Sequence, residues 1–260
     1  MPNDGFDLIL FAGQSNMAGR GCAEEAPVCP PGVAWEYRAV TSPNKLHPLA
    51  EPFGAMENIP GLIDDGEKKT GSLASAFAAE YHRLTRRGVV GVSASKGGTS
   101  SQEWRDALAQ DAAARLKQAA DWLRAQGLTP RHTLVLWCQG ETDGDHAVSA
   151  EEYRSNFESI WRRLQNAGAS CCGLIQIGHF NRALYPEDGR DVHYGVIRDE
   201  HLRLAGDLQG VFLAGSFAPY EGRMKDAFHY TQQAYNAVGR EAARNTAAAL
   251  STDAVTDKNQ

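Results

Sequence analysis

Short apolar runs and longer amphipathic segments alternate along this chain from residue 7 to about residue 250. Each apolar run has the length and composition of a strand that is buried on both faces of a parallel sheet. The five runs are 8–12, 89–94, 133–137, 172–178 and 210–214. We expect helices at 72–87, 107–126, 149–166, 190–205 and 231–250. The alternation predicts one doubly wound α/β domain, in which a central parallel sheet lies between two layers of helices.

Residues 20–70 form a long stretch without a clear strand or helix pattern. The stretch is rich in Pro and Gly, and a connection of this length inside a compact domain is usually functional. We predict a loop that crosses the carboxyl edge of the sheet and helps to wall a substrate cleft. Its candidates for substrate contact are Trp35, Tyr37, His47 and Phe53. Alternatively, these aromatic side chains only pin the loop to the domain.

The length of 260 residues suits a single large domain, and no linker or internal repeat divides the chain. We expect the domain to span residues 1–250 and residues 251–260 to form a frayed tail. The 26 basic and 32 acidic residues give a net charge of −6, and Lys and Arg form no cluster. Nucleic acid and anionic membrane surfaces are therefore not expected as partners. No apolar run approaches the roughly 18 residues that span a bilayer.

Five cysteines are present, so at least one is unpaired within a monomer. Cys22 and Cys29 could form a disulfide in an oxidising compartment, but we favour reduced thiols. No His or Cys spacing matches a zinc site, so no metal is expected. The first residues lack the basic and apolar regions of a signal peptide, which favours a cytoplasmic protein. A chain that begins after a removed signal peptide would look the same, so secretion is the alternative.

Residues 7–19, with the sequence DLILFAGQSNMAG, place a serine where a nucleophile is useful. The apolar run ends at Gly13, and Gln14, Ser15 and Asn16 follow where the strand would stop. Ligands bind outside the carboxyl ends of the strands in open α/β sheets. A helical turn that begins after the serine would leave backbone N–H groups free to hold a developing oxyanion. On this stretch alone, a serine that only caps a helix explains the pattern equally well.

Two other strand ends carry small or amide residues. The pair Gly97-Gly98 follows the run 89–94, and Gln139 follows the run 133–137. A glycine pair lets the backbone approach a ligand closely, although most such pairs are only turns. The N–H of Gly98, or of Gly97 one residue earlier, and the amide of Gln139 could therefore join an oxyanion hole.

Asp226 and His229 lie three residues apart just before the last expected helix. At this spacing the carboxylate can reach Nδ1 of the imidazole across a tight turn and leave Nε2 free as a base for Ser15. A serine hydroxyl needs such a base to act as a nucleophile. The pair alone is weak evidence, because such residues often lie on the surface without a role. The ordered set of fragments, all at the same edge of the sheet, indicates a hydrolase site.

Four of these blocks together resemble the SGNH hydrolases. They are GQSNM at 13–17, GGT at 97–99, QGETD at 139–143 and DAFH at 226–229. The sequence is most similar to the branch that contains sialate O-acetylesterases and the acetylxylan esterases of carbohydrate esterase family six. The resemblance extends from residue 7 to the last helix, and it implies a flavodoxin-like, three-layer form of the doubly wound domain. Cys138 and Thr142 depart from the family pattern, but neither stands at a catalytic position.

The resemblance implies a serine esterase that removes O-acetyl groups from a carbohydrate through an acetyl-enzyme, without a metal or organic cofactor. Ser15 would be the nucleophile, His229 the base and Asp226 the acid that orients it. The oxyanion hole would consist of Ser15, Gly98 and Gln139. The residues that support the site would be Gln14, Asn16, Gly97 and Glu141.

Two alternatives stay open. An SGNH lipase or thioesterase for longer acyl chains would keep the fold but needs an apolar groove, whereas the residues near Ser15 are polar or small. A non-catalytic sugar-binding module would be expected to lack Ser15 or His229, and both are present. The acetylated sugar and the oligomeric state have no readable signal in the sequence.

Overall fold

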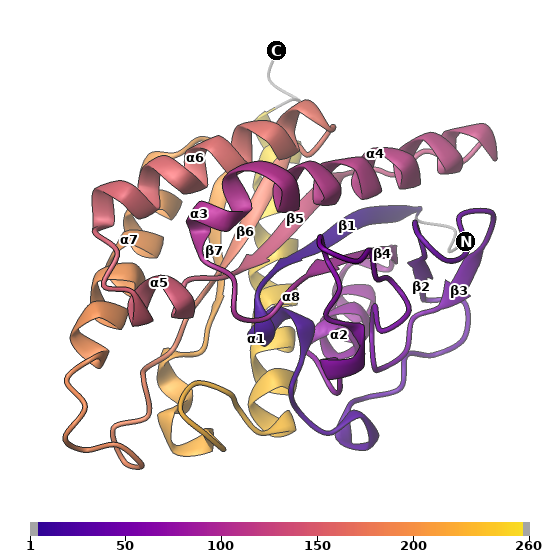
Figure 1. The fold of residues 1–260 in the computed structure, drawn as a ribbon. Helices are drawn as coiled ribbons and strands as arrows, with labels where there is room; N and C mark the ends of the chain where they lie inside the picture. The colour runs from indigo at the N-terminus through magenta and orange to yellow at the C-terminus, as the bar shows by residue number, and fades with distance from the viewer. Residues whose placement is uncertain (1–4, 257–260) are drawn as a thin grey trace.

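The computed structural model describes residues 5–256, and the seven strands within that range form one sheet. The strands are β1 (Phe6–Gly13), β2 (Ala34–Tyr37), β3 (Leu46–Pro48), β4 (Gly88–Ser95), β5 (Thr133–Cys138), β6 (Cys171–Gln176) and β7 (Val211–Ser216). They lie in the order β3-β2-β4-β1-β5-β6-β7, and every neighbouring pair is parallel except β2 and β3 (Figure 1). The five predicted strands are confirmed, and they follow the flavodoxin-like order.

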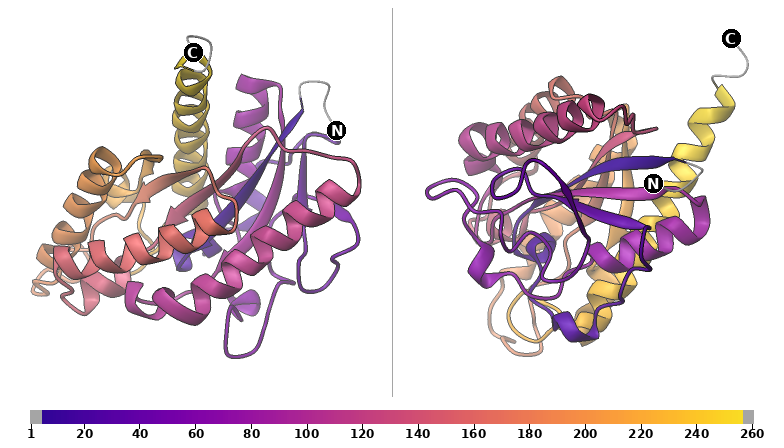
Figure 2. Two further views of the ribbon diagram at one scale, coloured as in Figure 1. Left: turned by 90° about the horizontal axis from the view of Figure 1, so that it is seen from above. Right: turned by 90° about the vertical axis from the view of Figure 1, so that its right-hand side faces the viewer.

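Helices cover both faces of the sheet, which confirms the doubly wound prediction. One face carries α2 (Ala74–Thr85) and α8 (Gln232–Thr256), and the other carries α4 (Ala109–Ala125), α6 (Ala150–Asn166) and α7 (Asp191–Asp207). Figure 2 shows these layers from above and from the side. The shorter elements are α1 (Ser15–Ala18), α3 (Ser101–Glu103), α5 (Glu141–Asp145), the 3-10 turns η1 (Ala23–Glu25), η2 (Gly66–Lys68) and η4 (Ala218–Arg223), and the π-helical η3 (Trp104–Leu108).

Strand β1 lies at the centre of the sheet, and its side chains pack against both helical layers. Leu8 and Leu10 belong to the core on the side of α4, whereas Ile9 and Phe11 belong to the core on the side of α2 and α8. All four side chains are buried, and each contributes roughly 1.5–3 kcal/mol to the free energy of unfolding. The carboxyl end of β1, where Ser15 follows, is therefore held from both sides.

Residues 20–70 are not the structureless loop that we predicted. They contain β2, β3, η1 and η2, and β2 joins the sheet beside β4. The strand signal is hidden by Glu36, a buried carboxylate within β2. Its Oε1 accepts a hydrogen bond from the N–H of Gly54 at 2.9 Å, and its Oε2 pairs with Arg38 at 2.7 Å. The antiparallel β3 is an edge strand, where a residue such as Pro48 is tolerated.

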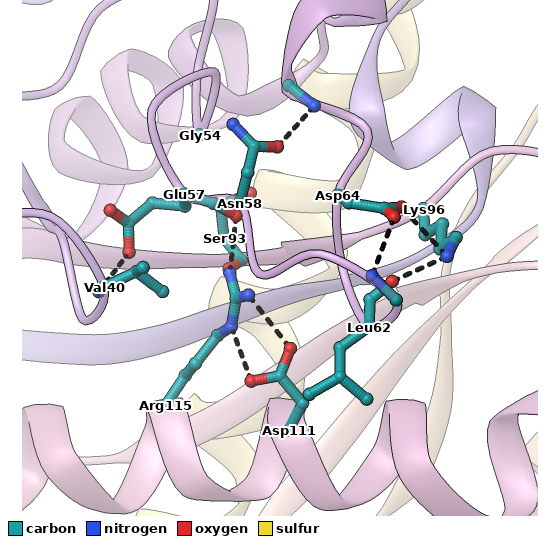
Figure 3. A network of polar contacts seen from close by, with 12 residues as sticks. Val40, Gly54, Glu57, Asn58, Leu62, Asp64, Ser93, Lys96, Asp111 and Arg115 are labelled. Carbon is teal, nitrogen blue, oxygen red and sulfur yellow. Dashed lines mark hydrogen bonds and ion pairs between the residues drawn. The ribbon is translucent and has the colours of Figure 1, made fainter.

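Two cationic side chains hold the second half of this stretch beside β4 (Figure 3). Arg115 of α4 is buried and donates Nη1 to the carbonyl oxygens of Glu57, at 3.0 Å, and Ser93, at 3.1 Å. Lys96, directly after β4, pairs with Asp64 at 2.9 Å. These contacts fix the segment that ends in η2 beside the carboxyl end of the sheet.

Two predicted boundaries are wrong. The helix expected at 107–126 already begins at Ser101, because α3 continues through η3 into α4. Ser100 and Glu103 form a capping box at this start. The last helix, expected to end at about residue 250, extends to Thr256, since no Gly or Pro interrupts the end of α8. Residues 257–260 lie outside the described residues.

Cys22 and Cys29 are free thiols, so the possible disulfide between them is not formed. Of the helices within residues 5–256, none combines the length and the apolar character that a membrane span requires.

Candidate active site

Ser15 is the first residue of α1 and follows β1 after a sharp turn. Strand β1 lies between β4 and β5, where the strand order reverses, and ligands bind at this point of doubly wound sheets. The turn requires glycine at position 13, because its φ is +134° and a Cβ would lie 1.9 Å from the carbonyl oxygen of Cys138. The sequence therefore places Ser15 at the centre of the carboxyl edge.

The structure brings Ser15, His229 and Asp226 into one row. Nε2 of His229 lies 2.9 Å from Oγ of Ser15, and Nδ1 lies 2.9 Å from Oδ2 of Asp226. With a proton on Nδ1, the imidazole donates to the carboxylate and accepts the hydroxyl proton of Ser15 through Nε2. This is the arrangement in which a histidine can act as a general base for a serine hydroxyl.

The carboxylate of Asp226 is bound by its own turn as well as by the imidazole. Its Oδ1 accepts hydrogen bonds from the N–H groups of Phe228, at 3.1 Å, and His229, at 2.8 Å. Burial alone would raise the pKa of this carboxyl, but the hydrogen bonds from His229 and the backbone hold the pKa well below its usual range. Asp226 is therefore ionised at neutral pH.

Asn16 and Glu141 support this turn from within the protein. Nδ2 of Asn16 donates to the carbonyl oxygen of Phe228 at 3.0 Å and to Oε1 of Glu141 at 2.5 Å. The hydroxyl of Tyr235 donates to Oδ1 of Asn16 at 2.7 Å. Burial raises the pKa of Glu141 to about 7, and its Oε2 has no partner among the described residues. The structure thus places both predicted supporting residues directly behind His229.

The site has a further support, Asn181, that sequence reasoning missed. Asn181 is buried and donates Nδ2 to the carbonyl oxygen of Asp226 at 2.9 Å, while its N–H donates to the carbonyl oxygen of Ala227 at 2.9 Å. It follows β6 in an irregular segment. A single asparagine in such a segment has no pattern that would single it out.

The two glycines after β4 differ in their backbone contacts. The N–H of Gly97 donates to Oδ2 of Asp65 at 2.9 Å. The N–H groups of Gly98 and Ser15 have no hydrogen-bond partner within residues 5–256, and both residues line the same pocket. Gly98 has a φ of +69°, and a Cβ there would meet open space. Free, rigidly held N–H groups beside a serine hydroxyl are suited to bind an oxyanion.

Gln139 follows β5 at the predicted strand end, but its side chain does not line the pocket of Ser15 and Gly98. Its side-chain Nε2 donates to a carboxylate oxygen of Asp143, to the carbonyl oxygen of Thr99 at 3.1 Å, and more weakly to Oε1 of Gln14 at 3.4 Å. The amide has two hydrogens for these three acceptors, so none is left for an oxyanion. Gln139 is fully buried and supports the turn after β4 instead. Gln14, predicted as a support, accepts from the N–H of Gly140 at 3.1 Å.

A pocket of about 260 Å³ opens above Ser15 and His229. The other residues that line it are Gln14, Arg20, Asp65, Lys68, Gly97, Gly98, Glu141, Thr142, Asp145 and Phe228. A larger cavity of about 440 Å³ lies at the opposite end of the sheet, near the start of β5, and contains none of these residues. Within residues 5–256, no group of three or more His, Cys, Asp or Glu side chains is arranged to hold a metal ion.

The aromatic residues of the stretch 20–70 pin it to the domain and do not line this pocket. Tyr37 and Phe53 are buried, and the ring of Phe53 packs on Phe11 with centroids 5.2 Å apart. Trp35 packs against the core beside α4. His47 lies in β3, opposite Glu36 of β2. The prediction that these four contact a substrate is therefore wrong. The stretch lines the pocket through Arg20, Asp65 and Lys68 instead.

One known family and several solved structures resemble this chain. The profile of the family described as "Carbohydrate esterase, sialic acid-specific acetylesterase" matches residues 5–248. No curated protein sequence matches the chain. A protein from Arabidopsis thaliana has the same fold with a TM-score of 0.67 and 21% identity, over 94% of this chain and 98% of its own. NanS has a TM-score of 0.61 and 16% identity, over 93% and 96%. A carbohydrate acetylesterase from Xanthomonas citri has a TM-score of 0.58 and 17% identity, over 92% and 55%.

Proposed function

Because the chain belongs to the family of carbohydrate esterases described as sialic acid-specific acetylesterases, it is a carboxylic-ester hydrolase, and we propose that Ser15, His229 and Asp226 form its catalytic triad. The substrate in this proposal is an O-acetylated saccharide. The observation that supports the triad most is the pair of 2.9 Å hydrogen bonds that joins the Ser15 hydroxyl to the imidazole and the imidazole to the Asp226 carboxylate.

In the first half of the reaction, Oγ of Ser15 attacks the carbonyl carbon of the acetyl group while Nε2 of His229 takes the hydroxyl proton. The carbonyl oxygen becomes an oxyanion, which the free N–H groups of Ser15 and Gly98 bind. The bond between the acetyl carbon and the sugar oxygen then breaks. His229 gives its proton to that oxygen, and an acetyl group remains on Ser15.

In the second half, a water molecule replaces the sugar. Nε2 of His229 takes a proton from the water as its oxygen attacks the acetyl carbon, and the same N–H groups bind the second oxyanion. Collapse of this intermediate breaks the bond to Oγ of Ser15, which recovers its proton from His229 as acetate leaves. Asp226 holds the proton on Nδ1 throughout and stabilises the imidazolium, because its carboxyl stays ionised.

The polar pocket favours an acetyl group over a longer acyl chain. A site for a long chain needs an apolar groove. Among the described residues that line this pocket, Phe228 is the one large apolar side chain, and Arg20, Asp65, Lys68 and Asp145 are charged. Such a lining suits the hydroxyl groups of a sugar. We therefore expect p-nitrophenyl acetate to be cleaved at least tenfold faster than p-nitrophenyl octanoate.

The proposal is tested by acetate release from a panel of acetylated saccharides and from p-nitrophenyl acetate. The Ser15→Ala variant should lose both activities and keep the thermal midpoint of the wild type. Ser251→Ala, at an exposed position of α8, is the matched control and should keep full activity. Full activity in Ser15→Ala would overturn the triad, and a preference for long acyl esters would overturn the substrate.

A further inference from the structure

The turn that follows β4 is held on both sides of Gly98. The N–H of Lys96 donates to the carbonyl oxygen of Gly13 at 2.9 Å, and the carbonyl oxygen of Lys96 accepts from the hydroxyl of Thr99 at 2.7 Å. The carbonyl oxygen of Thr99 accepts from the amide of Gln139 at 3.1 Å. The turn is therefore rigid, yet the N–H of Gly98 has no partner among the described residues.

The N–H of Gly97 is occupied by a side chain from a remote segment. Oδ2 of Asp65, which stands directly before η2, accepts both this N–H at 2.9 Å and Nη2 of Arg20 at 2.5 Å. Asp65 is only 4% exposed and lines the catalytic pocket. A Cβ on Gly97 would lie 2.5 Å from Nη2 of Arg20 and 3.2 Å from Cβ of Ser15. Gly97, the Arg20 guanidinium and Ser15 are therefore direct neighbours.

This arrangement removes an ambiguity that two consecutive glycines create. Two adjacent N–H groups beside Ser15 could each point toward an oxyanion. A backbone that alternates between these two orientations would bind the oxyanion poorly. The hydrogen bond from the N–H of Gly97 to Asp65 leaves the backbone of this turn with one orientation. The carboxylate would by itself repel a nearby oxyanion, but the guanidinium of Arg20 on the same oxygen offsets its charge.

We propose that Asp65 is a positioning residue, which binds the N–H of Gly97 and so makes Gly98 the glycine that donates to the oxyanion. This inference rests on the proposed function, because it assigns the second donor of the same oxyanion hole. In this proposal Asp65 acts on catalysis through its acceptor oxygen, which positions the turn. The segment that carries it is fixed to the sheet by Arg115 and by Lys96.

The test compares two substitutions of Asp65 with a control substitution at an exposed position of the same segment. Asp65→Ala removes the acceptor, and kcat for p-nitrophenyl acetate should fall about 10- to 100-fold while KM changes less than about threefold. Asp65→Asn keeps an amide oxygen for Gly97 and for Arg20, so kcat should stay within about threefold of the wild type. Glu67→Ala removes an exposed carboxylate of η2 on the same segment, and it should keep the wild-type kcat.

Two outcomes of the kinetics overturn the proposal. One is a wild-type kcat in Asp65→Ala. The other is an Asp65→Asn variant as slow as Asp65→Ala, since then the charge and not the acceptor matters. Neither outcome touches the proposed triad, which fails only if Ser15→Ala stays active.

A second measurement on the wild-type protein needs no substitution at Asp65. Diethyl p-nitrophenyl phosphate should attach a phosphoryl group to Ser15, and one oxygen of that group then occupies the oxyanion position. In ¹⁵N-labelled protein, the amide proton of Gly98 should move downfield on this reaction, and that of Gly97 should keep its position. A downfield shift at Gly97 without one at Gly98 overturns the proposal.

Discussion

Asn16 donates a hydrogen bond from Nδ2 to the carbonyl oxygen of Phe228, 3.0 Å away, although the two residues are 212 positions apart in the sequence. Asn16 directly follows Ser15, and Phe228 directly precedes His229. One buried side chain therefore sets how the two halves of the proposed proton relay face each other. Its remaining contacts, to Glu141 and Tyr235, hold that side chain in place.

Asn16→Ala should lower kcat for p-nitrophenyl acetate by about 10- to 100-fold, because small displacements of a base cost this much. It should also lower the free energy of unfolding by about 2–4 kcal/mol, since buried polar partners lose their hydrogen bonds. Urea denaturation and steady-state kinetics measure the two effects. Asn166→Ala, at an exposed position in α6, should change neither. Wild-type kcat in Asn16→Ala would show that the turn is held without it.

Asp226→Asn should lower kcat by about 10³- to 10⁴-fold with little change in the thermal midpoint. An asparagine amide can offer an N–H to Nδ1, which leaves the proton on Nε2, where the imidazole can no longer accept from Ser15. Asp207→Asn is the matched control, because Asp207 pairs with Arg154 on the surface and is 59% exposed. A loss of less than tenfold in Asp226→Asn would mean that His229 is oriented by other contacts.

The layer order and the strand ends could be predicted because they depend on local patterns. The apolar runs mark buried parallel strands, and the carboxyl ends of parallel strands always meet at one edge. Asp226 and His229 could be linked because both lie in one turn. Strand β2 could not be found, since its pattern is broken by Glu36, and the partners that stabilise this carboxylate are known only from the fold.

The orientation of side chains within the site was beyond sequence reasoning. Gln139 stands at the expected strand end, but its amide donates to Asp143, four residues later in the same block, and to Thr99, 40 positions away in the chain. Asp65 was not singled out, because its partner Gly97 is 32 positions away and is a backbone group. Contacts of this kind depend on where a loop lies in the folded protein, and the spacing of residues in the sequence does not predict that position.

Gly13→Ala should strongly destabilise the protein, by more than about 3 kcal/mol, because the added Cβ would meet backbone atoms of Cys138 at a φ of +134°. Gly206→Ala is a control of opposite sign. Gly206 lies within α7 at an exposed position where a Cβ meets nothing within 4 Å, so alanine should raise the free energy of unfolding by about 0.5–1 kcal/mol. Chemical denaturation of both variants checks the pair. A stable Gly13→Ala protein would mean that β1 and β5 can separate at their ends.

Glu141 should make the free energy of unfolding depend on pH. Burial raises its pKa from the ordinary value of 4.5 to about 7, with Asp145 and Asp143 adding to the rise and the Asn16 hydrogen bond opposing it. Below pH 4.5 the carboxyl is protonated in the folded and the unfolded chain, so its contribution is fully present. Between pH 4.5 and 7 the unfolded chain releases the proton first, so the contribution is lost as the pH rises, by about 3 kcal/mol in all.

Glu141→Gln removes this ionisation and keeps an oxygen for Asn16. The free energy of unfolding of the variant, relative to the wild type, should therefore rise by about 3 kcal/mol from pH 4.5 to pH 7 and stay level above pH 7. Subtraction of the two urea denaturation curves at each pH cancels the other titrating groups. Glu151→Gln, on the exposed face of α6, should give a flat difference because its carboxyl is in water in both states. A flat difference for Glu141→Gln as well would mean that the buried carboxyl is already ionised in the folded protein, and that Asn16 alone stabilises its charge.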